Sequence, residues 1–335
     1  QTSTTTTAAT LPTVAPAPAT PRIPLPSWEQ AAAWKPRMLI SIPGAARQAV
    51  ARALRTSVAE LAPNKPDAWL RFSFFAKVLL QKPGRQDKTT NYATCINRRC
   101  DRWCKGDAEQ ALLFHEAYVA SPSTTAGAIE SQDSFTVDSD ERSRAEPVQL
   151  ETAVDVDSLP PHAIRRAEQL AEQGFFAKAM AALSAAKVAD VSEENANVLR
   201  ALHPASPSPS VPVADERGRA PVFEQKAVRG ALASFGKGAS GGLSALSPQH
   251  ISEMCRGSTG APMEALTSVV NALASGTLPS QATSYFYGAR LVGLEKTGGG
   301  LRPVAAGDVF RRIAGKLLAQ CDGAKQAEQR LRDNR

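Results

Sequence analysis

Residues 288–318 read GARLVGLEKTGGGLRPVAAGDVFRRIAGKLL, and this stretch decides the fold expected for the C-terminal part of the chain. Residues 289–294 are apolar apart from Arg290, glycines occupy 298–300, and residues 301–305 are again largely apolar. Two short apolar runs joined by a glycine turn are typical of a β-hairpin. Residues 308–318 begin just after a glycine and predict a helix.

Cations surround the predicted turn and continue into the predicted helix. Lys296 precedes the glycines, Arg302 follows them, and Arg311, Arg312 and Lys316 lie in the helix. Lys and Arg stabilise charge on phosphates, and a guanidinium can contact two oxygens at once. Glycines let the backbone approach a ligand closely because they lack a Cβ. The helix spacing places at least two of its cations on one face.

The order of these parts resembles the entry to the fingers of reverse transcriptases from non-long-terminal-repeat retrotransposons. That family has an apolar–Lys strand end, a glycine turn, an Arg-Pro-(Ile/Val) step, a small-Gly-acid step and a helix with paired arginines and a lysine. The corresponding residues are Leu294-Glu295-Lys296, Gly298, Gly299, Gly300, Arg302-Pro303-Val304, Gly307-Asp308, Arg311, Arg312 and Lys316. The resemblance implies that Lys296 and Arg302 bind the incoming nucleotide, and that Arg311, Arg312 and Lys316 bind the template.

Upstream segments extend the resemblance. Residues 223–251 are similar to the segment that precedes the fingers in one branch of these elements, and residues 166–204 to the helical region before it. The family's catalytic carboxylates lie in the palm, and no Tyr/Phe-x-Asp-Asp occurs in the sequence. We therefore expect a fragment that stops before the palm, is inactive alone, and has no catalytic residue or metal site. Mg²⁺ is the cofactor expected for the full-length parent. Fingers without their palm are expected to leave apolar surface uncovered.

Outside the hairpin the sequence predicts helices joined by long disordered linkers. The expected fold class is mainly α with a small β-hairpin near the C-terminus, as in partial right-hand polymerase fingers. Apolar residues recur at spacings of three and four in 43–62, and 66–81 is a second, more apolar helix. Residues 88–118 predict one or two helices, Gly174 is expected to separate two more, and Ser192 to cap another. The predicted regions are a disordered Thr/Ala/Pro-rich tail (1–37), an N-terminal helical region (38–120), an acidic disordered linker (121–159), a helical region (160–204), a Pro-rich linker (205–221), the start of the reverse transcriptase domain (222–320) and a polar C-terminal tail (321–335).

Charge is distributed unevenly along the chain. The formal net charge is +7, acids dominate residues 130–157, and cations dominate from Arg290 onward. This pattern suggests that the C-terminal part binds an RNA or DNA template weakly. The five cysteines are odd in number and unevenly spaced, and no signal peptide is visible, so a reducing, intracellular location, cytoplasmic or nuclear, is expected. No apolar run is long enough to span a membrane. The sequence does not fix the oligomeric state, the parent element or its template.

Each of these features has a plainer interpretation. Lys296 and Arg302 can flank an ordinary surface hairpin, and the three helix cations can form a solvated face. The glycine-rich loop at 236–242 lacks the Gly-Lys-Ser/Thr ending of a phosphate-binding loop, so it is expected to be a flexible linker. His250 is expected to cap a helix or pack.

The cysteines raise a separate hypothesis. Cys95, Cys100 and Cys104, with His115, include the ligand types that zinc prefers, although the usual two-residue knuckle spacing is absent. Buried or half-exposed helix cysteines are the alternative. Two other functions therefore compete with the polymerase fragment. One is a non-enzymatic basic helical interaction or nucleic-acid-binding module, and the other is a zinc-dependent nucleic-acid-binding protein.

Overall fold

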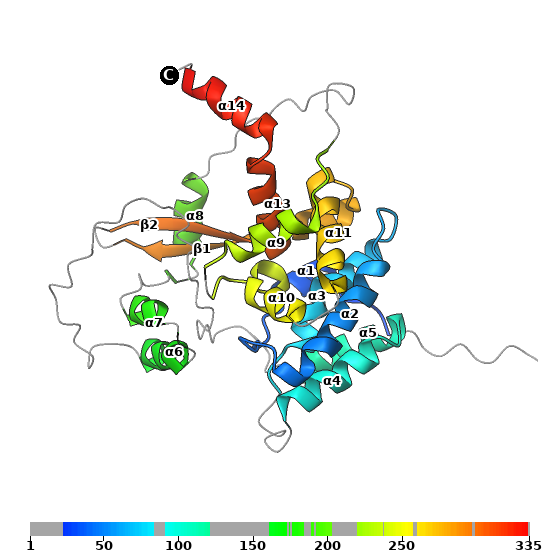
Figure 1. Ribbon diagram of the computed structural model, residues 1–335. Coiled ribbons are helices and arrows are strands. Elements are labelled where there is room, and N and C mark those ends of the chain that lie inside the picture. Colours follow the sequence, from blue (N-terminus) through cyan, green and yellow to red (C-terminus); the bar gives the residue numbers. More distant parts are fainter. Residues whose placement is uncertain are drawn as a thin grey trace, which may run out of the picture.

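The structure is a computed structural model of the 335-residue chain. It describes residues 23–333 apart from 84–90, 121–160, 173, 175, 184–188, 191, 203–219, 237, 257–259 and 297–298. The described residues are mainly helical, with a two-stranded antiparallel sheet near the C-terminus (Figure 1). The predicted fold class is confirmed at that level. The acidic linker, most of the Pro-rich linker and residues 1–22 of the predicted tail lie outside the described residues.

A short helix, α1 (Trp28–Ala33), lies within the region predicted as a disordered tail. Ser27 forms a capping box at its start: its side chain accepts a hydrogen bond from Gln30 N at 3.1 Å, and Gln30 Oε1 accepts one from Ser27 N at 2.8 Å. Trp34 follows the helix and is buried, and buried Lys77 donates from Nζ to its carbonyl oxygen at 2.8 Å. The prediction of disorder was therefore wrong for the described part of the tail, because capping and burial of a tryptophan outweigh its Pro and Ala content.

Four helices complete the N-terminal region, and a 3-10 turn, η1 (Gly44–Ala46), precedes them. They are α2 (Arg47–Ala59), α3 (Pro66–Leu79), α4 (Tyr92–Trp103) and α5 (Asp107–Ala120). The predicted helices at 43–62 and 66–81 are thus confirmed, and the stretch at 88–118 forms two. Helix α3 starts with a proline at its first position and is buried from Ala68 to Leu79, so it is the central helix of the region.

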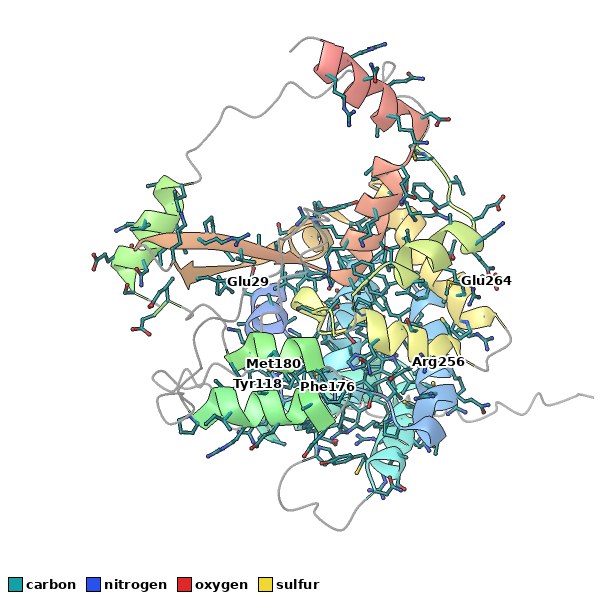
Figure 2. The ribbon with its side chains drawn as sticks, turned by 60° about the vertical axis from the view of Figure 1, so that its left-hand side comes forward. Glu29, Tyr118, Phe176, Met180, Arg256 and Glu264 are labelled. Atoms are coloured by element: carbon teal, nitrogen blue, oxygen red, sulfur yellow. The ribbon has the colours of Figure 1, made fainter. Side chains whose placement is uncertain are left out.

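The middle of the chain forms three short helices. They are α6 (Pro161–Glu172), α7 (Phe176–Leu183) and α8 (Glu193–Ala201). Ala167, Leu170 and Ala179 form a small cluster of their own between α6 and α7. Gly174 separates these helices, as predicted, and Ser192 Oγ caps α8 by accepting from Asn195 N at 3.1 Å. Figure 2 labels Phe176 and Met180 on α7; their side chains are exposed.

The C-terminal region consists of helices around one hairpin. Its elements are α9 (Gln225–Ala233), the 3-10 turn η5 (Gly242–Ser244), α10 (Pro248–Cys255), α11 (Ala261–Ser275), α12 (Ser280–Phe286), β1 (Ala289–Glu295), β2 (Leu301–Gly307), α13 (Val309–Ala319) and α14 (Asp322–Asp333). Helix α10 begins at Pro248, directly after the capping residue Ser247, and α12 was not predicted. Among the described helices, none is long and apolar enough to cross a membrane.

The glycine-rich loop before α10 is packed rather than free. Ala239, Ser244 and Leu246 within or beside it are buried. Gly242 has φ +71°, and a Cβ at this position would stand 2.6 Å from the Cα of Asp308. The interpretation of this loop as a flexible linker was therefore wrong. Its glycine serves a close approach between η5 and the start of α13, which a side chain would prevent.

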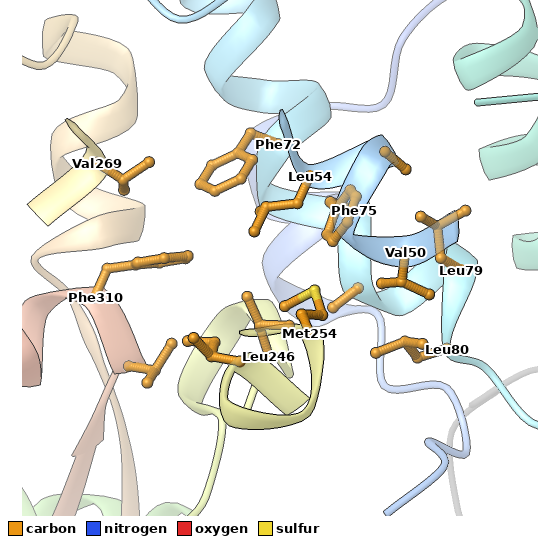
Figure 3. Close-up of a cluster of buried hydrophobic side chains, with 14 of the residues drawn as sticks. Val50, Leu54, Phe72, Phe75, Leu79, Leu80, Leu246, Met254, Val269 and Phe310 are labelled. Atoms are coloured by element: carbon orange, nitrogen blue, oxygen red, sulfur yellow. The ribbon is translucent and has the colours of Figure 1, made fainter. Parts of the chain in front are cut away.

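The N-terminal and C-terminal regions share one hydrophobic core, although about 100 residues separate them in the sequence. Figure 3 shows side chains of α2 and α3, such as Leu54 and Phe72, in the same cluster as Val269 of α11 and Phe310 of α13. The Phe72 ring lies 5.4 Å from the ring of Phe310 and 6.0 Å from that of Phe286, centroid to centroid. Aromatic packing at these distances contributes beyond simple burial, so α3 holds the two regions together.

Buried hydrogen bonds also join the N-terminal and C-terminal regions. Glu253 of α10 accepts from the backbone N of Ile42 at 2.6 Å, and Nε2 of His250 lies 2.9 Å from the carbonyl oxygen of Leu39. Nδ1 of His250 accepts from Ser247 N, so its proton is on Nε2 and is donated to Leu39. Burial lowers the pKa of His250, which keeps the ring neutral. The expectation that His250 caps and packs is confirmed.

Candidate nucleic-acid interface

The two strands form a regular antiparallel hairpin. Glu295 pairs with Leu301 and Leu294 with Arg302. The turn is closed by a hydrogen bond from Lys296 N to Gly300 O at 3.1 Å and one from Gly299 N to Lys296 O at 3.0 Å. Gly299 and Gly300 have φ near +85°, a region that side chains other than glycine rarely adopt. Gly298, the third predicted turn residue, lies outside the described residues.

Lys296 and Arg302 lie on neighbouring strands at the turn end of the hairpin. Arg302 stands opposite Leu294, and the hydrogen bond from Lys296 to Gly300 continues the ladder by one residue. Side chains two residues apart on a strand point to the same face, so the register places Lys296 on the face that carries Arg302. Both residues are exposed. The structure therefore puts the two predicted nucleotide-binding cations on one accessible edge of the hairpin.

The opposite face near the turn is covered. A Cβ at Gly293 would stand 3.5 Å from Cδ1 of Leu199 in α8 and 3.6 Å from Cβ of Ala189. The backbone N of Ala189 also donates to Gly293 O at 2.9 Å. Helix α8 thus supports the hairpin from the side away from Lys296 and Arg302, and fixes which face of the strands remains accessible.

Two of the three α13 cations are used inside the protein. Nζ of Lys316 lies 4.2 Å from the centroid of the Phe235 ring, and the guanidinium carbon of Arg312 lies 5.1 Å from the same centroid. Lys316 donates to Ser234 Oγ at 3.0 Å, and Arg312 donates to the carbonyl oxygen of Ser240. Cations over an aromatic face attract it electrostatically. Arg312 and Lys316 do share a helix face, as predicted, but that face packs against the end of α9 and the loop behind it.

Arg311 points elsewhere. Its Nη1 donates to the carbonyl oxygen of Gly288 at 3.3 Å, and a Cβ added at Gly307 would stand 3.3 Å from its Cδ. The side chain is exposed and lies over the root of the hairpin, between the last residue of β2 and the residue before β1. Among the predicted template-binding residues, Arg311 is thus the one whose side chain is exposed beside the strands.

Asp308 is a buried carboxylate. The sequence indicated no role for it beyond the Gly-acid step of the resemblance. Oδ1 accepts from Phe310 N and Oδ2 from Ser244 N, each at 3.1 Å. Burial raises the pKa of Asp308, while these hydrogen bonds and Arg312 act against that rise. A Gly-Asp step before a helix signals an N-cap, but nothing in the local sequence indicates the bond to Ser244. Asp308 ties the packed loop to α13.

The cysteine hypothesis gains no support from the geometry. Cys100 is fully buried on α4, and burial raises the pKa of its thiol. Cys104 accepts a weak hydrogen bond from Thr56 Oγ1 at 3.8 Å, and Cys95 is half-buried. In the described part of the chain, which includes these cysteines and His115, no three His, Cys, Asp or Glu side chains are grouped to hold a metal ion.

Comparison with protein-family models, with curated proteins and with solved structures finds no match for this chain.

Proposed function

We propose that residues 222–320 are the start of the fingers of a retroelement reverse transcriptase, and that the turn end of the β1–β2 hairpin binds phosphate. One observation carries the proposal: Lys296 and Arg302 are exposed on one face of the hairpin, beside a glycine turn. Two cations on one edge can share the charge of a triphosphate, and the guanidinium adds a bidentate contact. The glycines keep the backbone beside them free of side chains.

The α13 cations take different roles in this proposal. Arg311 lies at the root of the hairpin and is the candidate for contact with a template phosphate. Arg312 and Lys316 hold Phe235 and the packed loop, so they position α13 and the hairpin that precedes it. The parent enzyme would supply the metal-binding carboxylates and Mg²⁺ from its palm.

A second candidate function is a basic helical nucleic-acid-binding module without polymerase chemistry. It is favoured by the common core, because α3 of the N-terminal region packs directly on α12 and α13. Such a body needs no further domain to bury these aromatic residues. The two candidates differ in ligand: the first requires a triphosphate at the hairpin, whereas the second requires only a phosphate backbone.

Differential lysine labelling separates them. The full chain is treated with an amine-reactive acetylating reagent, with and without a deoxynucleoside triphosphate, and each lysine is quantified by mass spectrometry. The fingers proposal predicts protection of Lys296 by the triphosphate and none of Lys226, an exposed lysine on α9. Protection by RNA alone supports the second candidate, and equal labelling of Lys296 under all conditions refutes both roles for this residue.

Mutagenesis gives an independent readout. Fluorescence anisotropy with a labelled single-stranded RNA should show binding about tenfold weaker for Lys296→Ala plus Arg302→Ala, because about two phosphate contacts are lost. The matched control is Lys226→Ala plus Arg229→Ala, which removes the same charges from α9, where both residues are exposed. An equal loss in both variants would show that only net charge matters.

A further inference from the structure

Helices α2 and α4 lie side by side and run in the same direction (Figure 1). Three contacts define their register. Asn97 donates to the carbonyl oxygen of Ala45 just before α2, Arg52 pairs with Asp101 at 2.5 Å, and Thr56 meets Cys104. The residue numbers of the contact partners rise together along α2 and α4, so the two helices are parallel. Their exposed faces therefore lie next to each other.

The two helices carry an excess of arginine. Together they contain six arginines and one acidic residue, Asp101. Arg102 uses Glu109 and Glu116 of α5, at 2.7 Å each. Arg99 donates to the carbonyl oxygen of Gln81 at 2.7 Å. These two arginines therefore serve the packing of α4 rather than its outer surface.

Arg47 donates from Nε to the carbonyl oxygen of Ile42 at 3.2 Å, and the other three arginines of the two helices are exposed. We define the α2–α4 basic face as Arg52 and Arg55 of α2 with Arg98 and Lys105 of and just beyond α4, all four exposed. Asp101, between them, is occupied by Arg52. Within the described residues, Arg55, Arg98 and Lys105 form no ion pair with a carboxylate.

The nearby carboxylates are committed to other arginines. Glu60 and Asp107 both pair with Arg71, a buried residue of α3, at 3.5 and 3.0 Å. Burying a guanidinium requires such partners. Glu60 and Asp107 thus have a cationic partner in Arg71, although the Asp107 side chain stays 67 % exposed.

The positive charge of this face is only partly offset, because Asp101 pairs with Arg52. Arg52 and Arg55 are three residues apart on one helix. Neighbouring like charges on a helix repel by about 0.2–0.5 kcal/mol, and the Arg52–Asp101 pair reduces that repulsion here. The outer stripe of α4 extends from Arg98 to Lys105, about 10 Å at the helical rise of 1.5 Å per residue. The pair of helices therefore presents several exposed cations on one face, and a phosphate backbone can contact more than one of them.

The chemistry of the face favours nucleic acid over a folded protein partner. Protein interfaces centre on buried apolar and aromatic anchors. The described large apolar residues that are exposed include none on α2 and only Tyr92, at the far end of α4. Guanidinium groups without an apolar centre match phosphate oxygens.

We propose that the α2–α4 basic face binds the phosphate backbone of a nucleic-acid strand without reading its sequence. The face belongs to other elements than the hairpin, so this inference does not rest on the polymerase assignment. Contacts to phosphates alone carry no sequence information. Binding at this face should therefore depend steeply on salt and little on base composition.

The experiment measures anisotropy of a labelled single-stranded RNA with the full chain across a salt series. Arg55→Gln plus Arg98→Gln should weaken binding about tenfold and reduce the salt slope by about 1.4, since each phosphate contact on a single strand contributes about 0.7. The control, Arg229→Gln plus Arg256→Gln, makes the same charge change at exposed sites on α9 and just after α10. It should leave affinity and slope unchanged.

The results decide whether the α2–α4 basic face binds nucleic acid. An unchanged affinity in the Arg55/Arg98 variant, or an equal loss in the control, overturns the proposal. Tighter binding to phosphatidylserine vesicles than to RNA, lost in the same variant, overturns the assignment to nucleic acid. Arg302→Ala measured alongside separates the two sites. If only the Arg55/Arg98 variant weakens binding, this inference stands and the hairpin makes no contribution to RNA binding.

Discussion

Replacing Phe72 by alanine should destabilise both halves of the protein at once. Phe72 is 3 % exposed and its ring contacts those of Trp69 and Phe75 within the N-terminal half and of Phe286 and Phe310 in the C-terminal half. Truncating a buried phenylalanine to alanine costs about 3–5 kcal/mol through lost burial and a residual cavity. That is a large share of the about 5–15 kcal/mol that stabilises a typical domain.

Two probes in one urea titration test this expectation. All four tryptophans lie between residues 28 and 103, so tryptophan fluorescence reports the N-terminal half. Hydrogen exchange of the α11 and α13 amides reports the C-terminal half. Both should give the same loss of unfolding free energy for Phe72→Ala, and a smaller one, below about 1.5 kcal/mol, for the milder Phe72→Leu.

The control is Phe176→Ala, because Phe176 is 68 % exposed on α7 and its loss should change stability by less than about 0.5 kcal/mol. Suppose instead that α11 and α13 keep their wild-type exchange while the fluorescence midpoint falls. The two halves would then be independent domains, and the reasoning from the common aromatic cluster would be refuted.

Three further outcomes are expected in the same assays. Tyr285→Phe should cost about 1–3 kcal/mol, since its buried hydroxyl shares its one proton between the carbonyl oxygens of Ser73 and Leu243, which would lose their donor; a change below about 0.5 kcal/mol would contradict this. Because burial lowers the pKa of His250, its contribution is complete above about pH 6.5 and is lost as the pH falls through the folded-state pKa, by up to about 1.4 kcal/mol per pH unit. His250→Gln should flatten that dependence in urea titrations between pH 7.5 and 5, and His115→Gln, at an exposed site, should retain it. Gly242→Ala should cost more than about 2 kcal/mol because of its positive φ and the short contact to Asp308. Gly315→Ala, in open space on α13, should instead stabilise the protein by about 0.5–1 kcal/mol. If Gly315→Ala destabilised the protein more than Gly242→Ala, the close packing inferred at Gly242 would be wrong.

Local sequence patterns predict a helix correctly where the helix carries its own start and stop signals. Ser192 caps α8, Pro248 begins α10 after the capping residue Ser247, and Gly276 caps the end of α11. The two helices that were missed, α1 and α12, are short and lack a long apolar repeat. They are stabilised by each other: Trp28 packs on Tyr285 and Phe286 at centroid distances of 5.7 and 6.5 Å. No sequence window contains residues so far apart, so their formation cannot be read from local propensity.

The same limit applies to the candidate site. Spacing along α13 predicted that at least two of its cations share a face, and the structure shows that Arg312 and Lys316 do. The spacing could not show that this face meets Phe235, which lies about 80 residues earlier in the chain. A count of cations therefore overstates how many are available to a ligand. Such a count also understates the positive charge exposed on the N-terminal helices. There, the nearby acids pair with Arg71 and Arg102, so among the described residues Arg55 and Arg98 have no carboxylate partner.

The common core also changes what the resemblance at residues 288–318 implies. Fingers that lack a palm were expected to leave apolar surface uncovered. Here Phe286 and Phe310 are buried, and α3 of the N-terminal region supplies the rings that cover them. The N-terminal helices are therefore part of the body that supports the hairpin. Under the proposed function, a palm would have to lie against another surface of this body, and the nucleotide would lie beside the exposed edge that carries Lys296 and Arg302.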